Sequence, residues 1–265
     1  MPYPASLQRA FVTGATGFLG YRVVAALLEA DLRVTVLTRA EQADKLVAFQ
    51  SQVDIVYGDI WNRSSLTGMG RGQEAVIHLV GSAKADPTRG LTHQQINLVA
   101  ARNVIGMAIS AGIPHFILLS IAGLSGFVQS DYLRSKREAE DYLRNSGLGW
   151  TIIRAPAMSV PSLRRPVLYS MVMAGIVPPT RWAIGRYMPI AVDIAARGIV
   201  GALQETTAYQ GRILYANDLR RLARKNAPAA PLRFRPAEVR RPKDTPDLDE
   251  TPFGWLPPHP PHRRR

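Results

Sequence analysis

Cysteine is absent from this 265-residue chain, and lysine and histidine are rare, with five of each. Without cysteine the chain can form no disulfide, no thiolate nucleophile and no sulfur-ligated zinc site. The histidines lack His-x-x-x-His or similar ligand spacing, so we expect no metal site. The scarcity of lysine makes a lysine inside a recognisable pattern more informative than it would otherwise be.

Long hydrophobic runs are also missing, although 46% of the residues are hydrophobic, which is enough for a sizeable core. The most apolar stretch, residues 168–179, is shorter than the roughly 18 residues that a membrane-spanning helix needs, and it ends in two prolines. The N-terminus has neither the charged start nor the apolar core of a signal peptide. We therefore expect a cytoplasmic protein, and peripheral contact with a membrane stays open.

The net charge of +13 is unevenly distributed along the chain. Residues 219–265 hold 12 Lys and Arg against five Asp and Glu, together with ten of the 20 prolines. We interpret residues 226–265 as a basic, Pro-rich, non-globular tail. Its aromatic cluster at residues 253–256 could dock on a protein partner or on the chain's own domain, or be incidental. Nucleic-acid binding is not expected, because charge alone supports it and no known binding module is present.

Strand-like and helix-like segments alternate through most of the chain. Apolar residues at helical spacing predict helices at 19–28 and 96–108, and Asp193 is expected as the N-cap of a helix to about residue 203. Short β-branched runs predict strands at residues 10–13, 33–38, 55–57, 75–80, 115–120, 150–154 and 212–215. This alternation predicts the α/β class with a doubly wound, Rossmann-like parallel sheet.

A glycine loop follows the first predicted strand and opens the first helix. Glycine permits a positive φ and lets the backbone approach a pyrophosphate, which the N–H groups and dipole of a helix start can bind. A tight strand–helix turn without any ligand is the structural alternative. The placement between a strand and an amphipathic helix favours dinucleotide binding. The candidate contacts from this loop are Gly14, Thr16, Gly17, Phe18, Leu19 and Gly20.

The residue that selects between NAD and NADP is expected at the end of the second strand. An acidic residue there suits the ribose of NAD, and an arginine suits the 2′-phosphate of NADP. Arg39 stands there with no carboxylate before Glu41, which favours NADP over NAD, although Arg39 is also one of 28 arginines. Asp59, after the third strand, could accept a hydrogen bond from the adenine amine or form an ordinary turn. The further cofactor candidates are Ile60, Val80, Gly81, Lys136 and Pro156.

Tyr132 and Lys136 stand four residues apart on one face of the helix expected after the fifth strand. A tyrosine hydroxyl titrates at about pH 10, and a neighbouring ammonium would lower that pKa. Tyr132 could then exchange the proton that accompanies hydride transfer. Tyr-x-x-x-Lys also arises by chance, so its place after the fifth strand is what supports the assignment.

Together these motifs resemble the short-chain dehydrogenase/reductase superfamily in its atypical branch, over about residues 8–218. The chain is most similar there to the Tat-interactive-protein-like reductases and to the dehydrogenase-like accessory subunit of respiratory complex I. The family implies that Lys136 also binds the nicotinamide ribose and that residues 156–158 pack near the nicotinamide. The resemblance is carried by the glycine loop, Gly58-Asp59, Asn97 with Asn103, Tyr132 with Lys136, and Arg154-Ala155-Pro156.

One departure from the family concerns the serine that ends the fifth strand in active members and holds the substrate carbonyl. In an ungapped alignment Ile121 takes this position, and Ser120 lies one residue early. Successive strand residues point to opposite faces, so Ser120 needs a backbone shift to act there, and Ser125 or Ser130 could come from the loop instead. Ser120 is kept as a third catalytic candidate. The other interpretation is that catalysis has been lost while cofactor binding remains.

The domain is expected to span residues 1–225, with a substrate-side segment at residues 157–192. Apolar and aromatic residues alternate there with arginines, which suits a small or lipid-like ligand, a membrane surface or an anionic partner, or else a lid with solvated arginines. Two functions fit the sequence. One is an NADP(H)-dependent oxidoreductase acting on a carbonyl or hydroxyl compound. The other is a non-catalytic, NADP(H)-bound accessory, assembly or redox-sensing subunit of a larger complex.

Overall fold

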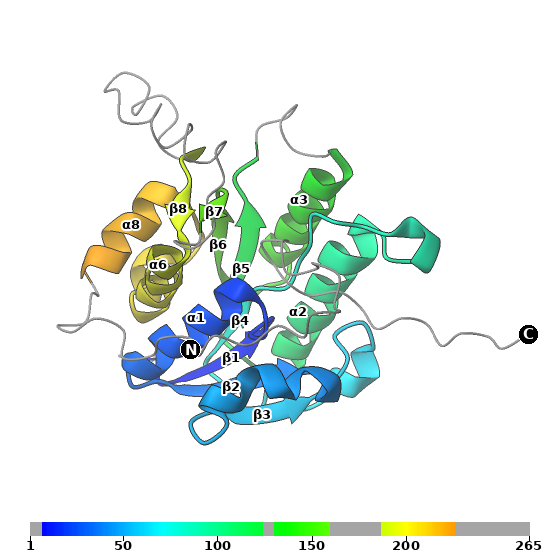
Figure 1. Ribbon diagram of the computed structural model, residues 1–265, viewed down its shortest axis with the longest axis horizontal. Helices are drawn as coiled ribbons and strands as arrows, with labels where there is room; N and C mark the ends of the chain where they lie inside the picture. Colours follow the sequence, from blue (N-terminus) through cyan, green and yellow to red (C-terminus); the bar gives the residue numbers. More distant parts are fainter. Residues whose placement is uncertain (1–6, 124–129, 160–186, 226–265) are drawn as a thin grey trace, which may run out of the picture.

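The computed structural model describes residues 7–123, 130–159 and 187–225. Seven parallel strands form the central sheet in the order β3-β2-β1-β4-β5-β6-β9 (Figure 1). The predicted α/β class with a doubly wound parallel sheet is confirmed. The strands are β1 (Arg9–Thr13), β2 (Arg33–Thr38), β3 (Asp54–Tyr57), β4 (Ala75–His78), β5 (His115–Ile121), β6 (Gly149–Ala155) and β9 (Arg212–Leu214).

Helices cover both faces of this sheet (Figure 1). Alternate residues of β1 enter two separate apolar cores, because Val12 joins the core under α1 and α6 while Phe11 joins the core under α2 and α3. One face carries α1 (Phe18–Glu29), α6 (Val192–Gln204) and α8 (Ala216–Lys225), and the other carries α2 (Ala100–Ser110) and α3 (Ser130–Arg144). Shorter helical segments are η1 (Ala40–Phe49), η2 (Arg63–Leu66), η3 (Pro87–Arg89), η4 (Gln94–Val99) and α7 (Thr206–Tyr209).

The carboxyl ends of the parallel strands share one edge of the sheet, and the loops that leave them carry the predicted site. The glycine loop follows β1, Arg39 follows β2, Asp59 lies just after β3, and Val80 and Gly81 lie just after β4. The strand order runs outward from β1 in one direction and from β4 in the other. The carboxyl ends of β1 and β4 therefore mark the topological switch point, the place where open α/β sheets bind their ligands.

The predicted strands are all present, with small differences at their ends. β4 ends at His78 rather than at residue 80, and beyond it the Val80 carbonyl accepts a hydrogen bond from Lys136 Nζ at 3.1 Å. β9 is one residue shorter than predicted, because the Tyr215 N–H donates to Asp218 Oδ2 at 3.0 Å and leads into α8. Both differences arise from side-chain contacts that the local sequence pattern does not reveal.

Two of the helix predictions need correction. The segment expected as one helix at residues 96–108 begins as the π-helix η4 and continues as α2. The N-cap of α6 is Ala191, without a side-chain cap, so the assignment of Asp193 as N-cap was wrong. Asp193 instead lies in the first turn of α6, where its Oδ1 pairs with Arg22 Nε of α1 at 2.8 Å. This ion pair joins the two helices that share one face of the sheet.

A small second sheet marks the beginning and end of the expected substrate-side segment. Its strands β7 (Met158–Ser159) and β8 (Ile190–Ala191) pair in parallel. Residues 160–186 of that segment, the tail at 226–265 and Ser125 lie outside the described residues. The proposed domain limits therefore stay a prediction.

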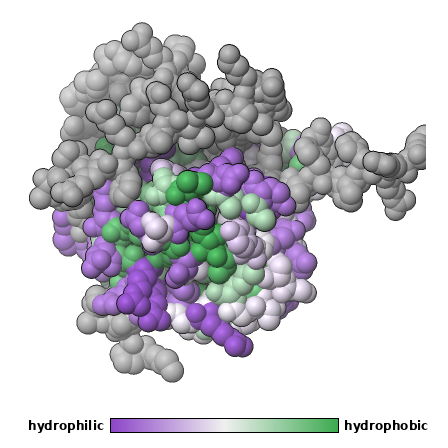
Figure 2. All heavy atoms as spheres, turned by 60° about the horizontal axis from the view of Figure 1, so that its bottom comes forward, coloured by the Kyte–Doolittle hydropathy of each residue, from purple (hydrophilic) through white to green (hydrophobic). Residues whose placement is uncertain are grey.

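The surface below the β2–β3 end of the sheet mixes hydrophobic and hydrophilic side chains, as seen when the bottom of Figure 1 is turned forward (Figure 2). Among the described residues, Val47 of η1 and Tyr57 of β3 are the most exposed large apolar ones, at 62% and 55%. Within the three described ranges, no helix is long and apolar enough to cross a membrane. The expected cytoplasmic location stays a prediction.

Candidate functional site

The glycine loop has the geometry that a dinucleotide cradle requires. Gly14 has a φ of +81°, in the region that favours glycine, and α1 begins at Phe18 with Gly17 as its N-cap. A Cβ on Gly20 would lie 2.0 Å from the Gly14 carbonyl oxygen, so only glycine lets the first turn of α1 pass this close to the loop. In the described part of the chain no side chain caps this helix start, so its N–H groups can bind an anion.

Arg39 lies at the end of β2, beside the glycine loop. Burial lowers the pKa of the half-buried guanidinium, while the charges of Glu41 and Asp59 act in the opposite direction. The neighbouring Thr16 of the loop donates a hydrogen bond from Oγ1 to Gln42 Oε1 at 3.0 Å. Gln42 was not predicted, and it joins η1 to the glycine loop at the place where the sequence puts the choice between NAD and NADP.

Asp59 and Ile60 are held by a turn after β3. The Trp61 N–H donates to Asp59 Oδ1 at 2.9 Å, so the turn anticipated as an alternative is present. The buried Ile60 offers its carbonyl to Asn103 Nδ2 of α2 at 2.9 Å. The contact of Asp59 with adenine stays a prediction, and Asn103 is explained by its bond to this turn.

Lys136 is buried below the carboxyl ends of β4 and β5. Its Nζ donates to the carbonyl oxygens of Val80 at 3.1 Å and Leu119 at 3.2 Å. A Cβ on Gly81 would lie 2.3 Å from this nitrogen and 2.8 Å from Asn97 Oδ1. Glycine at position 81 therefore leaves the room that the ammonium occupies, and the predicted residues Val80, Gly81 and Lys136 do come together.

Tyr132 lies on the first turn of α3 and is buried. Within the described residues its hydroxyl has no hydrogen-bond partner. Burial raises the pKa of Tyr132, and it lowers the pKa of Lys136 to about 7 although the charge of Glu140 acts against it. The expectation that Lys136 lowers the pKa of Tyr132 is therefore wrong for this arrangement, in which two carbonyl groups hold the ammonium. A buried hydroxyl without a partner is a natural place for a ligand oxygen.

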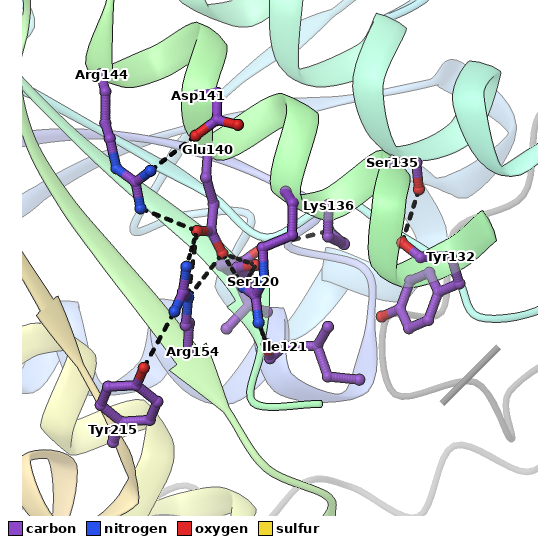
Figure 3. A network of polar contacts seen from close by, with 12 residues as sticks. Ser120, Ile121, Tyr132, Ser135, Lys136, Glu140, Asp141, Arg144, Arg154 and Tyr215 are labelled. Atoms are coloured by element: carbon purple, nitrogen blue, oxygen red, sulfur yellow. Dashed lines mark hydrogen bonds and ion pairs between the residues drawn. The ribbon is translucent and has the colours of Figure 1, made fainter. Parts of the chain in front are cut away.

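Ser120 and Ile121 point to opposite sides of the sheet, as the strand alternation predicts. Ser120 Oγ donates to the Glu140 carboxylate at 2.5 Å, whereas Ile121 packs against the core cluster that contains Tyr132 (Figure 3). Ser120 thus has its hydroxyl committed to an ion-pair network. Its catalytic role stays a prediction that needs a backbone shift.

Among the other candidates, Pro156 is buried directly after β6 and Ser130 is exposed at the start of α3.

Two further polar residues lie under the site without having been predicted. Glu140 is fully buried and stands four residues after Lys136 and eight after Tyr132, so the helical spacing could have identified it. His78 is also fully buried, and its Nδ1 is 2.8 Å from Thr13 Oγ1 below the glycine loop. Burial, with the charge of Lys136 added to it, lowers the pKa of His78 to about 3, so the imidazole is neutral.

These residues fit a dinucleotide better than a metal ion. A cradle that excludes a Cβ, an uncapped helix start and a buried hydroxyl lie along one edge of the sheet. Across the described ranges no group of three His, Asp or Glu residues could hold a metal ion. The site can therefore bind an extended anionic ligand, and Tyr132 and Lys136 lie at the end far from Arg39.

Comparison with known proteins also indicates a dinucleotide-binding protein. Residues 14–167 match a protein family described as NAD(P)H-binding. The chain is 32% identical over 190 residues to a Caulobacter vibrioides protein named ceramide reductase, covering 71% of this chain and 59% of that protein. It is 28% identical over 210 residues to Arabidopsis thaliana NADH dehydrogenase (ubiquinone) 1 alpha subcomplex subunit 9, mitochondrial, covering 77% of this chain and 52% of that protein.

The chain thus spans between half and three fifths of the length of these two relatives. Among solved structures, the UDP-glucuronic acid 4-epimerase from Bacillus cereus in complex with NAD matches with a TM-score of 0.59 at 17% identity. That match covers 78% of this chain and 77% of the epimerase. A likeness at this level of identity shows a shared fold alone.

Proposed function

Because the chain belongs to the NAD(P)H-binding family of atypical short-chain dehydrogenases/reductases, we propose that it binds NADP(H) across the carboxyl edge of its sheet. The observation that carries this proposal is the cradle formed by Gly14 and Gly20, with Arg39 at the end of the next strand. A guanidinium can pair bidentately with a 2′-phosphate, and no carboxylate stands at position 39 to favour the NAD ribose. NADP(H) is accordingly preferred to NAD(H).

The favoured activity is reduction of a carbonyl compound. The bound dinucleotide would supply the hydride. Tyr132 would donate a proton from its hydroxyl to the carbonyl oxygen, since burial favours the neutral phenol. Lys136 would bind the nicotinamide ribose, as the family resemblance implies. The similarity to a ceramide reductase supports a lipid-like substrate, which also suits the apolar substrate-side segment.

A second candidate function is that of a non-catalytic, NADP(H)-bound subunit. Ile121 at the serine position and the commitment of Ser120 to Glu140 favour it. The similarity to a subunit of NADH dehydrogenase adds support. In this case residues 226–265 would contact a larger, membrane-associated assembly, and the dinucleotide would serve stability or redox sensing.

Cofactor binding is tested first by thermal shift with NADPH, NADH or no ligand. At a hundred times its dissociation constant a ligand stabilises the folded state by roughly 2.7 kcal/mol, so NADPH should raise Tm clearly and NADH less. Arg39→Asp should lose the preference for NADPH. Arg33→Asp, at the opposite end of the same strand, is the matched control and should keep it. The proposal would be overturned if neither NADPH nor NADH raised the Tm of the unmodified chain.

Catalysis is tested by NADPH oxidation with a panel of carbonyl compounds that includes long-chain ketones. Tyr132→Phe should nearly abolish turnover and leave NADPH affinity almost intact. Tyr142→Phe, on the outer face of the same helix, should change neither. Turnover that survives in Tyr132→Phe would refute the role of this hydroxyl. If no carbonyl is reduced, co-purification with a larger assembly that is lost on deleting residues 226–265 would establish the second function.

A further inference from the structure

The end of β5 is fixed to α3 residue by residue. The Leu119 carbonyl accepts from Lys136 Nζ at 3.2 Å, and the carbonyl of Ile121 accepts from Arg137 Nη2 at 3.0 Å. Between them, Ser120 donates its hydroxyl to the Glu140 carboxylate (Figure 3). Three consecutive strand residues are thus each bound by a different polar side chain of one helix.

Glu140 is the centre of this arrangement. Its carboxylate is fully buried and accepts from Arg154 of β6, with Nη2 at 2.6 Å and Nε at 3.1 and 3.2 Å. Arg137 pairs with the same carboxylate, and Arg144 lies 3.3 Å from its second oxygen (Figure 3). Arg154 continues the network to the Tyr215 hydroxyl at 3.1 Å. One buried anion therefore connects α3 with the carboxyl ends of two strands and with the residue before α8.

Three arginines pair with Glu140, although one positive charge would be enough to neutralise its carboxylate. Burial alone would raise the pKa of Glu140, but the hydrogen bonds from Arg154 and Ser120 and the charge of Arg137 outweigh burial, so its pKa lies below the ordinary value. Glu140 is thus ionised over the whole physiological range. Burying a permanently charged group costs desolvation free energy. We therefore expect either the charge of Glu140 or its contacts to have a role.

We propose that Glu140 is a positioning residue for Lys136: its carboxylate holds the end of β5 on α3 and supplies a negative charge that favours the protonated form of the buried lysine. The inference rests on the proposed cofactor site, since Lys136 is the residue expected to bind the nicotinamide ribose. Loss of Glu140 would release Ser120, and with it the carbonyl of Leu119 that accepts from Lys136.

The other charged and titratable groups around Lys136 are few in the described residues. His78 of β4 is neutral, because burial and the charge of Lys136 itself lower its pKa. From η4, His93 reaches the Tyr132 ring, with ring centroids 5.6 Å apart. Arg137 and Arg154 face Glu140 directly. Burial lowers the pKa of Lys136, and Glu140 is the group that acts in the opposite direction.

The test is a titration of Lys136 by NMR on protein with ¹³C-labelled lysine, which needs neither cofactor nor turnover. The chain has only five lysines, so the Lys136 signal can be assigned by its loss in Lys136→Met. Lys136 should titrate at about 7 in the unmodified chain and roughly one pH unit lower in Glu140→Gln. The matched control is Asp141→Asn, which removes a charge from the next residue, 64% exposed, and should leave the titration unchanged.

An unchanged titration in Glu140→Gln would overturn the proposal, and so would an equal shift in Asp141→Asn. If Glu140→Gln does not fold, the partly exposed Arg137 supplies a second test. Arg137→Gln leaves the carboxylate less neutralised, so the Lys136 pKa should rise. An unchanged or lowered pKa there would count equally against the proposal.

Cofactor affinity separates positioning from general damage to the fold. NADPH should bind Glu140→Gln several-fold more weakly than the unmodified chain at pH 7, where Lys136 is about half protonated in the unmodified chain and mostly neutral in the variant, and about equally at pH 5, where Lys136 is protonated in both. A defect of the same size at both pH values would reduce Glu140 to a structural role. If the unmodified chain binds no NADPH at all, the proposed function fails, while the lysine titration still decides the inference.

Discussion

Lys136 is a buried cation, and its replacement should change how the stability of the fold depends on pH. Its pKa is lowered from 10.5 to about 7 by burial. Between these two values the unfolded chain holds a proton on Lys136 that the folded chain has lost, so stability rises with pH in this range. Below pH 7 both states are protonated, and the folded state then carries the full cost of burying an ammonium.

The magnitude follows from the two pKa values. Each pH unit between them contributes about 1.4 kcal/mol, so the free energy of unfolding should gain about 4 kcal/mol from Lys136 between pH 6 and pH 10. Lys136→Met keeps the apolar stem and removes the charge, which abolishes this contribution. Relative to the unmodified chain, the variant should therefore be most stabilised at pH 6 and should lose that advantage by pH 10.

The measurement is urea denaturation followed by circular dichroism at pH 6, 7, 8, 9 and 10 for both proteins. Only the difference between them is used, because other groups also titrate in this range and cancel in the difference. The absence of cysteine removes disulfide exchange at alkaline pH as a complication. A difference that stays flat from pH 6 to pH 10 would refute the conclusion that a charged Lys136 is unfavourable where it lies.

Four other substitutions, one of them a control, have definite expected outcomes. Gly20→Ala places a Cβ 2.0 Å from the Gly14 carbonyl oxygen and should cost at least about 1–3 kcal/mol in urea denaturation and abolish the NADPH thermal shift. Gly106→Ala, where nothing lies within 4 Å, should be neutral or slightly stabilising, and equal losses at both glycines would contradict the steric argument. Tyr132→Phe removes a buried hydroxyl without a partner in the described residues and should stabilise the ligand-free chain by about 1 kcal/mol, whereas a loss of stability would reveal a hydrogen bond at this hydroxyl. Ile121→Ser should raise carbonyl reduction if the missing serine limits turnover, and unchanged rates in an active chain would show that another group holds the substrate oxygen.

The placement of the loops at the proposed cofactor end of the site could be predicted because their signals are local. The spacing of Gly14, Gly17 and Gly20 between a strand and a helix is readable directly from the sequence, as is Arg39 after the second strand. Parallel strands then bring these loops to one edge without further information. The alternation of strand residues also predicted that Ser120 and the next residue point to opposite sides.

The environment of Tyr132 and Lys136 could not be predicted in this way. The spacing of the two residues placed them on one face of a helix, but the carbonyl groups that hold Lys136 come from the ends of β4 and β5, far away in sequence. The pKa of Tyr132 was expected to fall and instead rises, because burial depends on packing that no local pattern records. Glu140 lies on the same helix face and was overlooked, since a glutamate in a polar helix is usually solvated.

The pairing of β7 with β8 has a consequence for how the molecule is divided. The chain departs from the large sheet after β6 and comes back beside its own point of departure, where Arg220 also donates to the carbonyl of Pro189 at 2.9 Å. The pairing of β7 with β8 thus fixes the exit and the return of the chain to each other. A substitution that weakens this pairing should therefore disturb both strands together, while the large sheet keeps its own strand pairs.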